Sequence, residues 1–151
     1  AVAAFWERAR AAVGLPADGS PPATVGPFGD SVELADELLG YVLDGPKRAT
    51  ASSLAALEHD GDPVPKPGDL WIVTDGAGHP RALLRTTDVR IGPLSSVDDQ
   101  FAWDEGEGDR TRASWLDDHT RYYARYLPTI GRRFDPDMAT VFERFALVYR
   151  E

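Results

Sequence analysis

Apolar side chains recur every three or four residues in three stretches of the chain, and this spacing predicts three amphipathic helices. The first helix covers residues 3–13 and ends where a glycine and a proline follow. The second begins at Asp30, which forms a capping box with Glu33, and ends at residues 44–46. The third covers residues 111–126 and carries a tryptophan, a histidine and three tyrosines at spacings of three and four.

Short runs rich in β-branched and aromatic residues predict strands between and after these helices. One strand begins at residues 48–51, and two more, 70–74 and 81–91, flank the sequence DGAG, which is typical of a β-hairpin turn. Residues 140–150 alternate well enough between apolar and polar side chains to close a sheet. A helix satisfies the periodicity of that last segment as well.

Two segments lack such periodicity and are predicted to be loops. Residues 15–29 are rich in Pro, Gly and Ser, and residues 101–111 form an acidic stretch punctuated by glycines. The chain contains no repeat and no sign of a second domain. The predicted elements follow one another as helices first and then short strands with one inserted helix. This order predicts a single α+β domain over residues 1–151, built around a small barrel.

The composition narrows the classes of function. Hydrophobic residues make up 42% and charged residues 27% of the chain, which is typical of a globular protein, and the lack of cysteine suits a cytoplasmic one. The net charge of -9 argues against a protein that coats long DNA or RNA, but a locally basic cleft can still take a nucleoside. No apolar run approaches the ~20 residues that cross a bilayer, and charges interrupt the apolar N-terminus, so we expect neither a membrane anchor nor a signal peptide.

The segment 44–53, DGPKRATASS, places Lys47 and Thr50 between the end of a predicted helix and the start of a strand. It is either an ordinary loop or the rim of a site for a polar or anionic ligand. A desolvated, neutral lysine acts as a base or nucleophile, whereas a charged one stabilises a phosphate or an oxyanion. On these residues alone, a solvated lysine and a threonine that fills a strand position explain the segment too, and only a bend would bring the two side chains together.

The acidic stretch offers carboxylates for the same chemistry. Glu105 and Glu107 lie between glycines, which let the backbone approach a ligand closely. One carboxylate can protonate a leaving amine or hold Lys47 in place. A divalent cation bound by the oxygen-rich residues 104–109 is the alternative, although their spacing is not that of an EF-hand, and an exposed acidic turn is another. We expect no metal and no other cofactor.

Two motifs together connect the chain to a family. The first is G-x-K-x-A-T at residues 45–50, and the second is E-G-E-G-D followed by W-x-x-x-H at residues 105–119. With these motifs the chain resembles the ASCH domains, the activating-signal-cointegrator homology group of the PUA-like superfamily, from residue 28 to residue 123. Residues 1–27 are then an N-terminal helix and loop extension. The resemblance implies a small PUA-like β-barrel with a cleft flanked by helices, and relatives that bind or process RNA or modified nucleosides, with ribonucleases and amidohydrolases among them.

The resemblance also assigns roles to residues of this chain. Lys47 matches the cleft lysine of the family, Thr50 the hydroxyl three positions later, and Glu105 the acidic partner, so these three are the expected catalytic residues. Tyr41 matches a tyrosine that faces the cleft in ribonuclease-like members. Because this chain has EGEGD in the later loop, Glu107 competes with Glu105 for the acidic role.

Further polar residues are expected to contact the substrate. Together with Tyr41 and Glu107 they are Arg48, Ser52, Arg85, Thr111 and His119. A histidine beside aromatic residues is also typical of packing. Four arginines near the acidic stretch, at positions 110, 112, 121 and 125, can either grip phosphates or pair with the surplus carboxylates.

The sequence therefore predicts an RNA- or modified-nucleoside-related cleft protein that acts as a hydrolase. If the substrate is an acylated cytidine, Lys47 activates Thr50 or a water and Glu105 passes the proton to the departing amine. If it is single-stranded RNA, Lys47 stabilises the anionic phosphorus and Glu105 or Tyr41 handles the proton. The alternatives are a non-catalytic RNA- or nucleotide-binding regulatory module, and a domain that binds an unrelated small acid or a protein.

Overall fold

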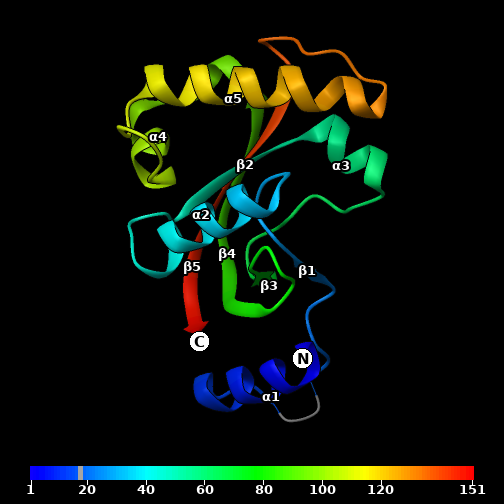
Figure 1. Cartoon of the computed structure of the whole chain (residues 1–151), viewed down its shortest axis with the longest axis vertical. Helices are drawn as coiled ribbons and strands as arrows, with labels where there is room; N and C mark the ends of the chain where they lie inside the picture. Colours follow the sequence, from blue (N-terminus) through cyan, green and yellow to red (C-terminus); the bar gives the residue numbers. More distant parts are fainter. Residues whose placement is uncertain (17–18) are drawn as a thin grey trace.

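The computed structural model describes residues 1–16 and 19–151, and five strands in it form one sheet in the order β1-β3-β4-β5-β2 (Figure 1). The strands are β1 (Thr24–Gly26), β2 (Ala49–Ser53), β3 (Leu70–Thr74), β4 (Pro80–Pro93) and β5 (Ala139–Arg150). β1 runs parallel to β3, and all the other neighbours are antiparallel.

The two long strands, β4 and β5, give the sheet its curvature. Their pairing slips between Leu83 and Leu84 and again between Thr86 and Asp88. Irregularities of this kind bend a strand and increase its twist. The sheet therefore curls into a half-barrel, and the predicted α+β architecture with helices around a barrel-like sheet is confirmed.

Among the described residues, five helices surround the sheet. They are α1 (Val2–Val13), α2 (Val32–Leu43), α3 (Leu54–Asp60), α4 (Asp99–Glu105) and α5 (Arg112–Tyr126). In Figure 1, α5 lies across one end of the sheet, α1 lies at the opposite end, and α2 lies between them. Residues 94–96 and 127–130 add two short 3-10 turns.

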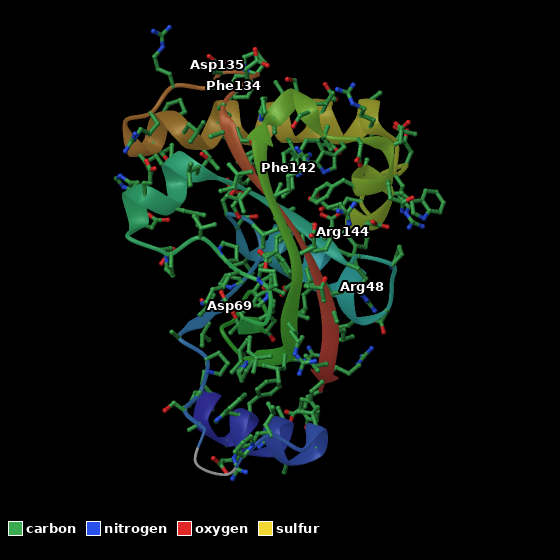
Figure 2. The ribbon with its side chains drawn as sticks, turned by 180° about the vertical axis from the view of Figure 1, so that it is seen from behind. Arg48, Asp69, Phe134, Asp135, Phe142 and Arg144 are labelled. Atoms are coloured by element: carbon green, nitrogen blue, oxygen red, sulfur yellow. The ribbon has the colours of Figure 1, made fainter. Side chains whose placement is uncertain are left out.

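The core is divided because neighbouring strand residues face opposite sides of the sheet. On β3, Ile72 packs against α1, whereas the next residue, Val73, packs against α2. A third cluster joins Phe101 of α4 and Trp115 of α5 to Phe142, which Figure 2 shows on β5 near α5. Helices α4 and α5 are thereby fixed against the sheet next to the start of β2.

Most predicted elements are confirmed. The helices predicted at 3–13 and 111–126 are α1 and α5, the hairpin strands are β3 and β4, and the last segment is a strand and not a helix. The segment 15–29 was wrong as a pure loop, because residues 24–26 form β1. Only pairing with the distant β3 makes a strand of these three residues, and no alternation in their own sequence signals it.

Three local details also differ from the sequence-based expectation. The cap of α2 is Ser31 and not Asp30, since the Ser31 hydroxyl accepts the backbone N–H of Leu34 at 3.1 Å. Helix α3, which buries no residue, was not predicted. The acidic stretch is not a loop from its start, because residues 99–105 form α4, capped by Asp98.

Candidate functional site

A cavity of about 400 Å³ lies between α2, α5, the start of β2 and the segment that follows α4. Most of its polar lining comes from the regions that the sequence singles out. Its lining residues with charged, hydroxyl or imidazole groups are Glu37, Tyr41, Lys47, Thr50, Glu105, Glu107, Asp118, His119, Tyr122, Tyr123 and Arg125. Cavities of this volume hold small organic ligands in other proteins.

Lys47 enters this cavity because of the way α2 ends. Asp44 caps the helix, and a Cβ on Gly45 would lie 2.9 Å from the carbonyl oxygen of Tyr41, so only glycine fits this close turn. The backbone N–H of Lys47 then donates to that same carbonyl at 3.1 Å. The side chain points inward and is 1% exposed, so the alternative of a solvated lysine, left open by the residues alone, is wrong.

The ammonium group of Lys47 is surrounded by oxygen atoms. Its Nζ donates to the Ala49 carbonyl and to Oε2 of Glu107, each at 2.8 Å, and to the Glu105 carbonyl at 3.4 Å. A carboxylate oxygen of Glu105 lies 3.6 Å away. A charged lysine has three donors and no acceptor, and this set of partners matches that inventory. Lys47 is therefore held as a cation between two carboxylates.

Glu105 is the last residue of α4, and Gly106 in the left-handed conformation (φ 70°) turns the chain so that Glu107 faces the same ammonium. Glu105 is 2% exposed and both of its oxygens are occupied. One accepts the indole N–H of Trp115, and the other lies 3.0 Å from Nε2 of His119. Burial alone would raise the pKa of Glu105, but the charges of His119 and Lys47 outweigh it and hold that pKa well below the usual range.

His119 is charged for a geometric reason. Its Nδ1 lies 2.8 Å from the carbonyl oxygen of Trp115, and its Nε2 faces the Glu105 carboxylate. Both partners accept hydrogen bonds, so both ring nitrogens must carry a proton. Burial works against that charge, but the nearby Glu105 carboxylate raises the pKa of His119 overall. The imidazole ring also stacks on the Trp115 indole at 3.8 Å between centroids.

Glu107 differs from Glu105 in its surroundings. Burial raises its pKa to about 7, and the negative charge of Glu105 acts in the same direction, whereas Lys47 opposes both. Its side chain is 23% exposed and opens to the cavity. The structure thus separates two neighbouring carboxylates into one that stays ionised and one that titrates near neutral pH.

Six of the ten residues that the sequence predicts to act on or contact the substrate line this one cavity. They are Tyr41, Lys47, Thr50, Glu105, Glu107 and His119. Thr50 reaches it from β2, three residues after Lys47, because the chain turns into the strand between them. The hydroxyl of Tyr41 donates to Glu37 at 2.8 Å. His119 stacks on Trp115 and also lines the cavity, so its contact with a substrate stays a prediction.

Four residues predicted to contact substrate do not line the cavity. Arg48 donates to the backbone carbonyls of Val42 and Lys47, and Figure 2 shows it beside β5, next to Arg144. Thr111 caps α5 by accepting the N–H of Ser114, and its own hydroxyl donates to Asp109. Ser52 and Arg85 lie in β2 and β4 away from the cavity lining. Backbone geometry, which the sequence does not display, decides these four positions.

The side chains of the acidic stretch have different partners. Asp104 pairs with Arg144, Asp109 accepts from Thr111, and both glutamates face Lys47. Within residues 1–16 and 19–151, no three His, Asp or Glu side chains gather in a way that could hold a metal ion. Of the nearby arginines, Arg121 and Arg125 pair with carboxylates, whereas the other two donate to backbone carbonyls.

Sequence reasoning missed several lining residues. Glu37 and Asp118 add carboxylates, Phe28 adds an aromatic ring 5.4 Å from the Lys47 ammonium, and Tyr123 adds a hydroxyl. Tyr123 lies four residues after His119, on the same side of α5. That spacing was the only available signal for it.

Comparison with known proteins shows the family of this chain. The sequence model described as "ASCH domain" matches residues 24–149. The chain belongs to the ASCH domain family. A search of curated proteins gives no match. The family is PUA-like and RNA-related, so the resemblance drawn from the two motifs is confirmed.

Two solved structures show how much of the chain has the same fold as known proteins. A crystal structure of a protein from Enterococcus faecalis is 35% identical, with a TM-score of 0.87, and the match covers 97% of this chain and 87% of the other. An ASCH domain from Lactobacillus crispatus is 28% identical, with a TM-score of 0.85 and coverage of 99% and 94%. Both matches include nearly the whole chain, the first helix among it. In the described part of this ASCH domain, no helix has the length and apolar character to span a bilayer.

Proposed function

We propose that this ASCH domain hydrolyses an amide bond on the base of a modified nucleoside, such as an N-acetylated cytidine. The observation that supports this most directly is the shared cavity of Lys47, Thr50 and the two glutamates, in which a buried ammonium contacts both carboxylates. A hydroxyl, a fixed cation and a carboxylate with a pKa near neutrality are the groups that amide hydrolysis uses.

The size and lining of the cavity suit a single nucleoside. About 400 Å³ accommodates one base with its ribose, but not a folded RNA. The rings of Phe28 and Tyr122 line it, and aromatic side chains stack on unpaired bases. An RNA-related family and a cavity of nucleoside size point to the same class of ligand.

The charges in the cavity favour an amide over a phosphodiester. The lining includes the carboxylates of Glu37, Glu107 and Asp118, whereas Lys47 is already shared between two glutamates. The lining arginine, Arg125, pairs with Asp30 at 3.1 Å. A phosphate requires cations that are not already neutralised. An uncharged acylated base meets no such obstacle.

The reaction then needs one proton carrier, and Glu107 suits this role better than Glu105. In its ionised form Glu107 takes a proton from a water held by the Thr50 hydroxyl, while the water oxygen bonds to the amide carbon and the carbonyl electron pair moves onto oxygen. When the carbonyl re-forms, the C–N bond breaks and Glu107 returns the proton to the departing amine. The products are the free amine and a carboxylic acid, which ionises.

The other charged groups of the cavity keep their charges throughout this reaction. When Glu107 takes the proton, Lys47 loses one of its two counter-charges, and its positive charge can then stabilise the developing oxyanion. Glu105 stays ionised and balances the imidazolium of His119. None of these three groups has to gain or lose a proton during the reaction.

The test is turnover of N4-acetylcytidine by the purified chain, followed by chromatography of cytidine and acetate. Lys47→Ala and Thr50→Val should lower kcat by about 100-fold or more, whereas Lys66→Ala, at an exposed lysine paired with Asp69, should not change it. Thr50→Val keeps the shape of the side chain, so its loss of activity cannot be assigned to unfolding if its melting temperature matches the wild type.

A parallel incubation with short single-stranded RNA separates the other functions. Cleavage of the RNA in place of the nucleoside would replace the amidase proposal with a ribonuclease. Salt-sensitive binding of RNA with no product from either substrate would identify a non-catalytic RNA-binding module.

A further inference from the structure

The hydroxyl of Tyr123 is a polar group of the cavity for which the structure provides no internal partner. Tyr123 lies on α5, one turn after His119, and is 2% exposed. It lines the cavity, and its ring lies 6.2 Å from that of His119. Within the described residues no hydrogen bond reaches its hydroxyl, yet the enclosed side-chain atoms without a partner are only those of Arg10 and Trp71, so the Tyr123 hydroxyl opens to the cavity.

The ring of Tyr123 is buried, but its hydroxyl lies at the wall of the cavity. A polar group in this position forms its hydrogen bonds with water or with a ligand that enters the cavity. The neighbouring polar groups are satisfied within the chain, since His119, Glu105, Lys47 and Tyr41 all have partners. The Tyr123 hydroxyl is therefore available to a molecule that enters the cavity.

The charges near Tyr123 determine whether its hydroxyl donates a hydrogen bond to a ligand or accepts one from it. Burial raises the pKa of Tyr123 well above its usual value, and the negative charges of Glu105 and Glu107 act in the same direction. The hydroxyl thus keeps its proton and can donate it. Tyr123 lines the same cavity as Lys47 and both glutamates, and its ring lies next to His119, which contacts Glu105.

We propose that Tyr123 donates a hydrogen bond to the carbonyl oxygen of the scissile amide and stabilises the negative charge that develops on it. This inference rests on the proposed function and adds a catalytic residue to it. Lys47 and Tyr123 then approach the oxyanion together, one as a cation and one as a neutral donor. A neutral donor gains most when the oxygen becomes charged, so its contribution appears in kcat more than in KM.

The test compares Tyr123→Phe with Tyr126→Phe, a half-buried tyrosine on the same helix that does not line the cavity. With N4-acetylcytidine, Tyr123→Phe should lower kcat by about 100-fold, with KM and the melting temperature nearly unchanged, while Tyr126→Phe matches the wild type. Calorimetric binding of the product cytidine should change less than about threefold, because the product lacks the acyl carbonyl. A kcat of Tyr123→Phe within about threefold of wild type would overturn the inference and leave the proposed function intact.

Failure of the proposed function gives a different pattern. If the wild type does not turn over N4-acetylcytidine, its affinity for that compound still tests the hydrogen bond, and Tyr123→Phe should weaken binding by about fivefold or more. Equal affinities for wild type and variant would refute the role of Tyr123. If the wild type neither binds nor cleaves the compound, both proposals fall.

Discussion

The ammonium nitrogen of Lys47 lies 2.8 Å from a carboxylate oxygen of Glu107, yet the pKa of Glu107 is raised to about 7. An ion pair at this distance normally lowers the pKa of the acid. Here burial has the larger effect, and Lys47 is shared with Glu105, whose own negative charge disfavours a second one. The pair therefore divides into a permanent anion and a group that can exchange a proton at neutral pH.

The first prediction concerns the pH dependence of turnover. Glu107 acts as a base only when ionised, so kcat/KM for N4-acetylcytidine should rise as the pH increases through about 7 and level off above it. Glu107→Gln should remove this limb of the profile and lower kcat by about 100-fold or more. A profile that is flat across this range in the wild type would exclude Glu107 as the base.

A second prediction concerns the pH dependence of stability, through His119. Its folded-state pKa is raised, so its ion pair stabilises the fold fully below the unfolded value of 6.5, and this stabilisation is lost as the pH rises through the folded value. His119→Gln should therefore reduce the free energy of unfolding more at about pH 5.5, where breaking a buried pair costs about 3 kcal/mol, than at about pH 9.

Urea denaturation at the two pH values measures this difference. Glu105, Glu107 and Tyr123 lie around position 119 in both proteins. The substitution also changes the titration of Glu105, because His119 is the charge that lowers the pKa of Glu105 most, and this change is part of the measured difference. Tyr126→Phe, on the same helix, serves as a control with no pH-dependent change. An equal loss at both pH values would show that His119 is neutral and acts through packing alone.

The sequence was sufficient for the elements that carry a local signal. Regular apolar spacing located α1, α2 and α5, and the DGAG turn located the hairpin of β3 and β4. The strand β1 was missed because its three residues are defined only by pairing with a distant strand. The cap of α2 was misplaced by one residue, since Asp30 and Ser31 are both good caps and only the extended backbone of Ser31 (φ -144°) selects between them.

The candidate site was likewise predicted from the sequence only in part. Motifs identified Lys47 and Glu105, because two short patterns in combination are specific. They did not separate Glu105 from Glu107, since the distinction depends on Trp115 and His119, which occupy both oxygens of Glu105 only in the folded chain. Arg48 was expected at the cavity, yet backbone carbonyls hold its guanidinium elsewhere, a contact that no pattern in the sequence encodes.

The third prediction concerns a carboxylate buried in the sheet, away from the cavity lining. Glu143 on β5 is 6% exposed and accepts the Thr86 hydroxyl at 2.6 Å. Burial raises its pKa, and the hydrogen bond from Thr86 partly opposes this. Thr86→Val removes the donor without changing the shape of the side chain, and should cost about 1–3 kcal/mol of unfolding free energy.

The adjacent threonine provides the control for that measurement. Thr87 is exposed, so Thr87→Val should change the unfolding free energy by less than about 0.5 kcal/mol. Similar denaturation midpoints for the two variants would mean that the Thr86 hydroxyl does not contribute to the stability of the sheet.

The last prediction concerns the glycine that separates the two glutamates. Gly106 has a φ of 70°, and a Cβ there would lie 2.8 Å from the backbone nitrogen of Lys47 and 2.9 Å from its Cα. Gly61 has a similar φ of 72°, but open space surrounds its Cβ position.

Replacing either glycine by alanine introduces the same backbone strain, so the difference between the two variants isolates the contact with Lys47. Gly106→Ala should lose about 1–3 kcal/mol more than Gly61→Ala in urea denaturation, and it should also lose turnover, because the backbone of Lys47 must move away from both carboxylates. Equal losses of unfolding free energy for the two variants would show that the backbone around Lys47 moves without energetic cost. Such a backbone is incompatible with a preorganised ammonium in the cavity.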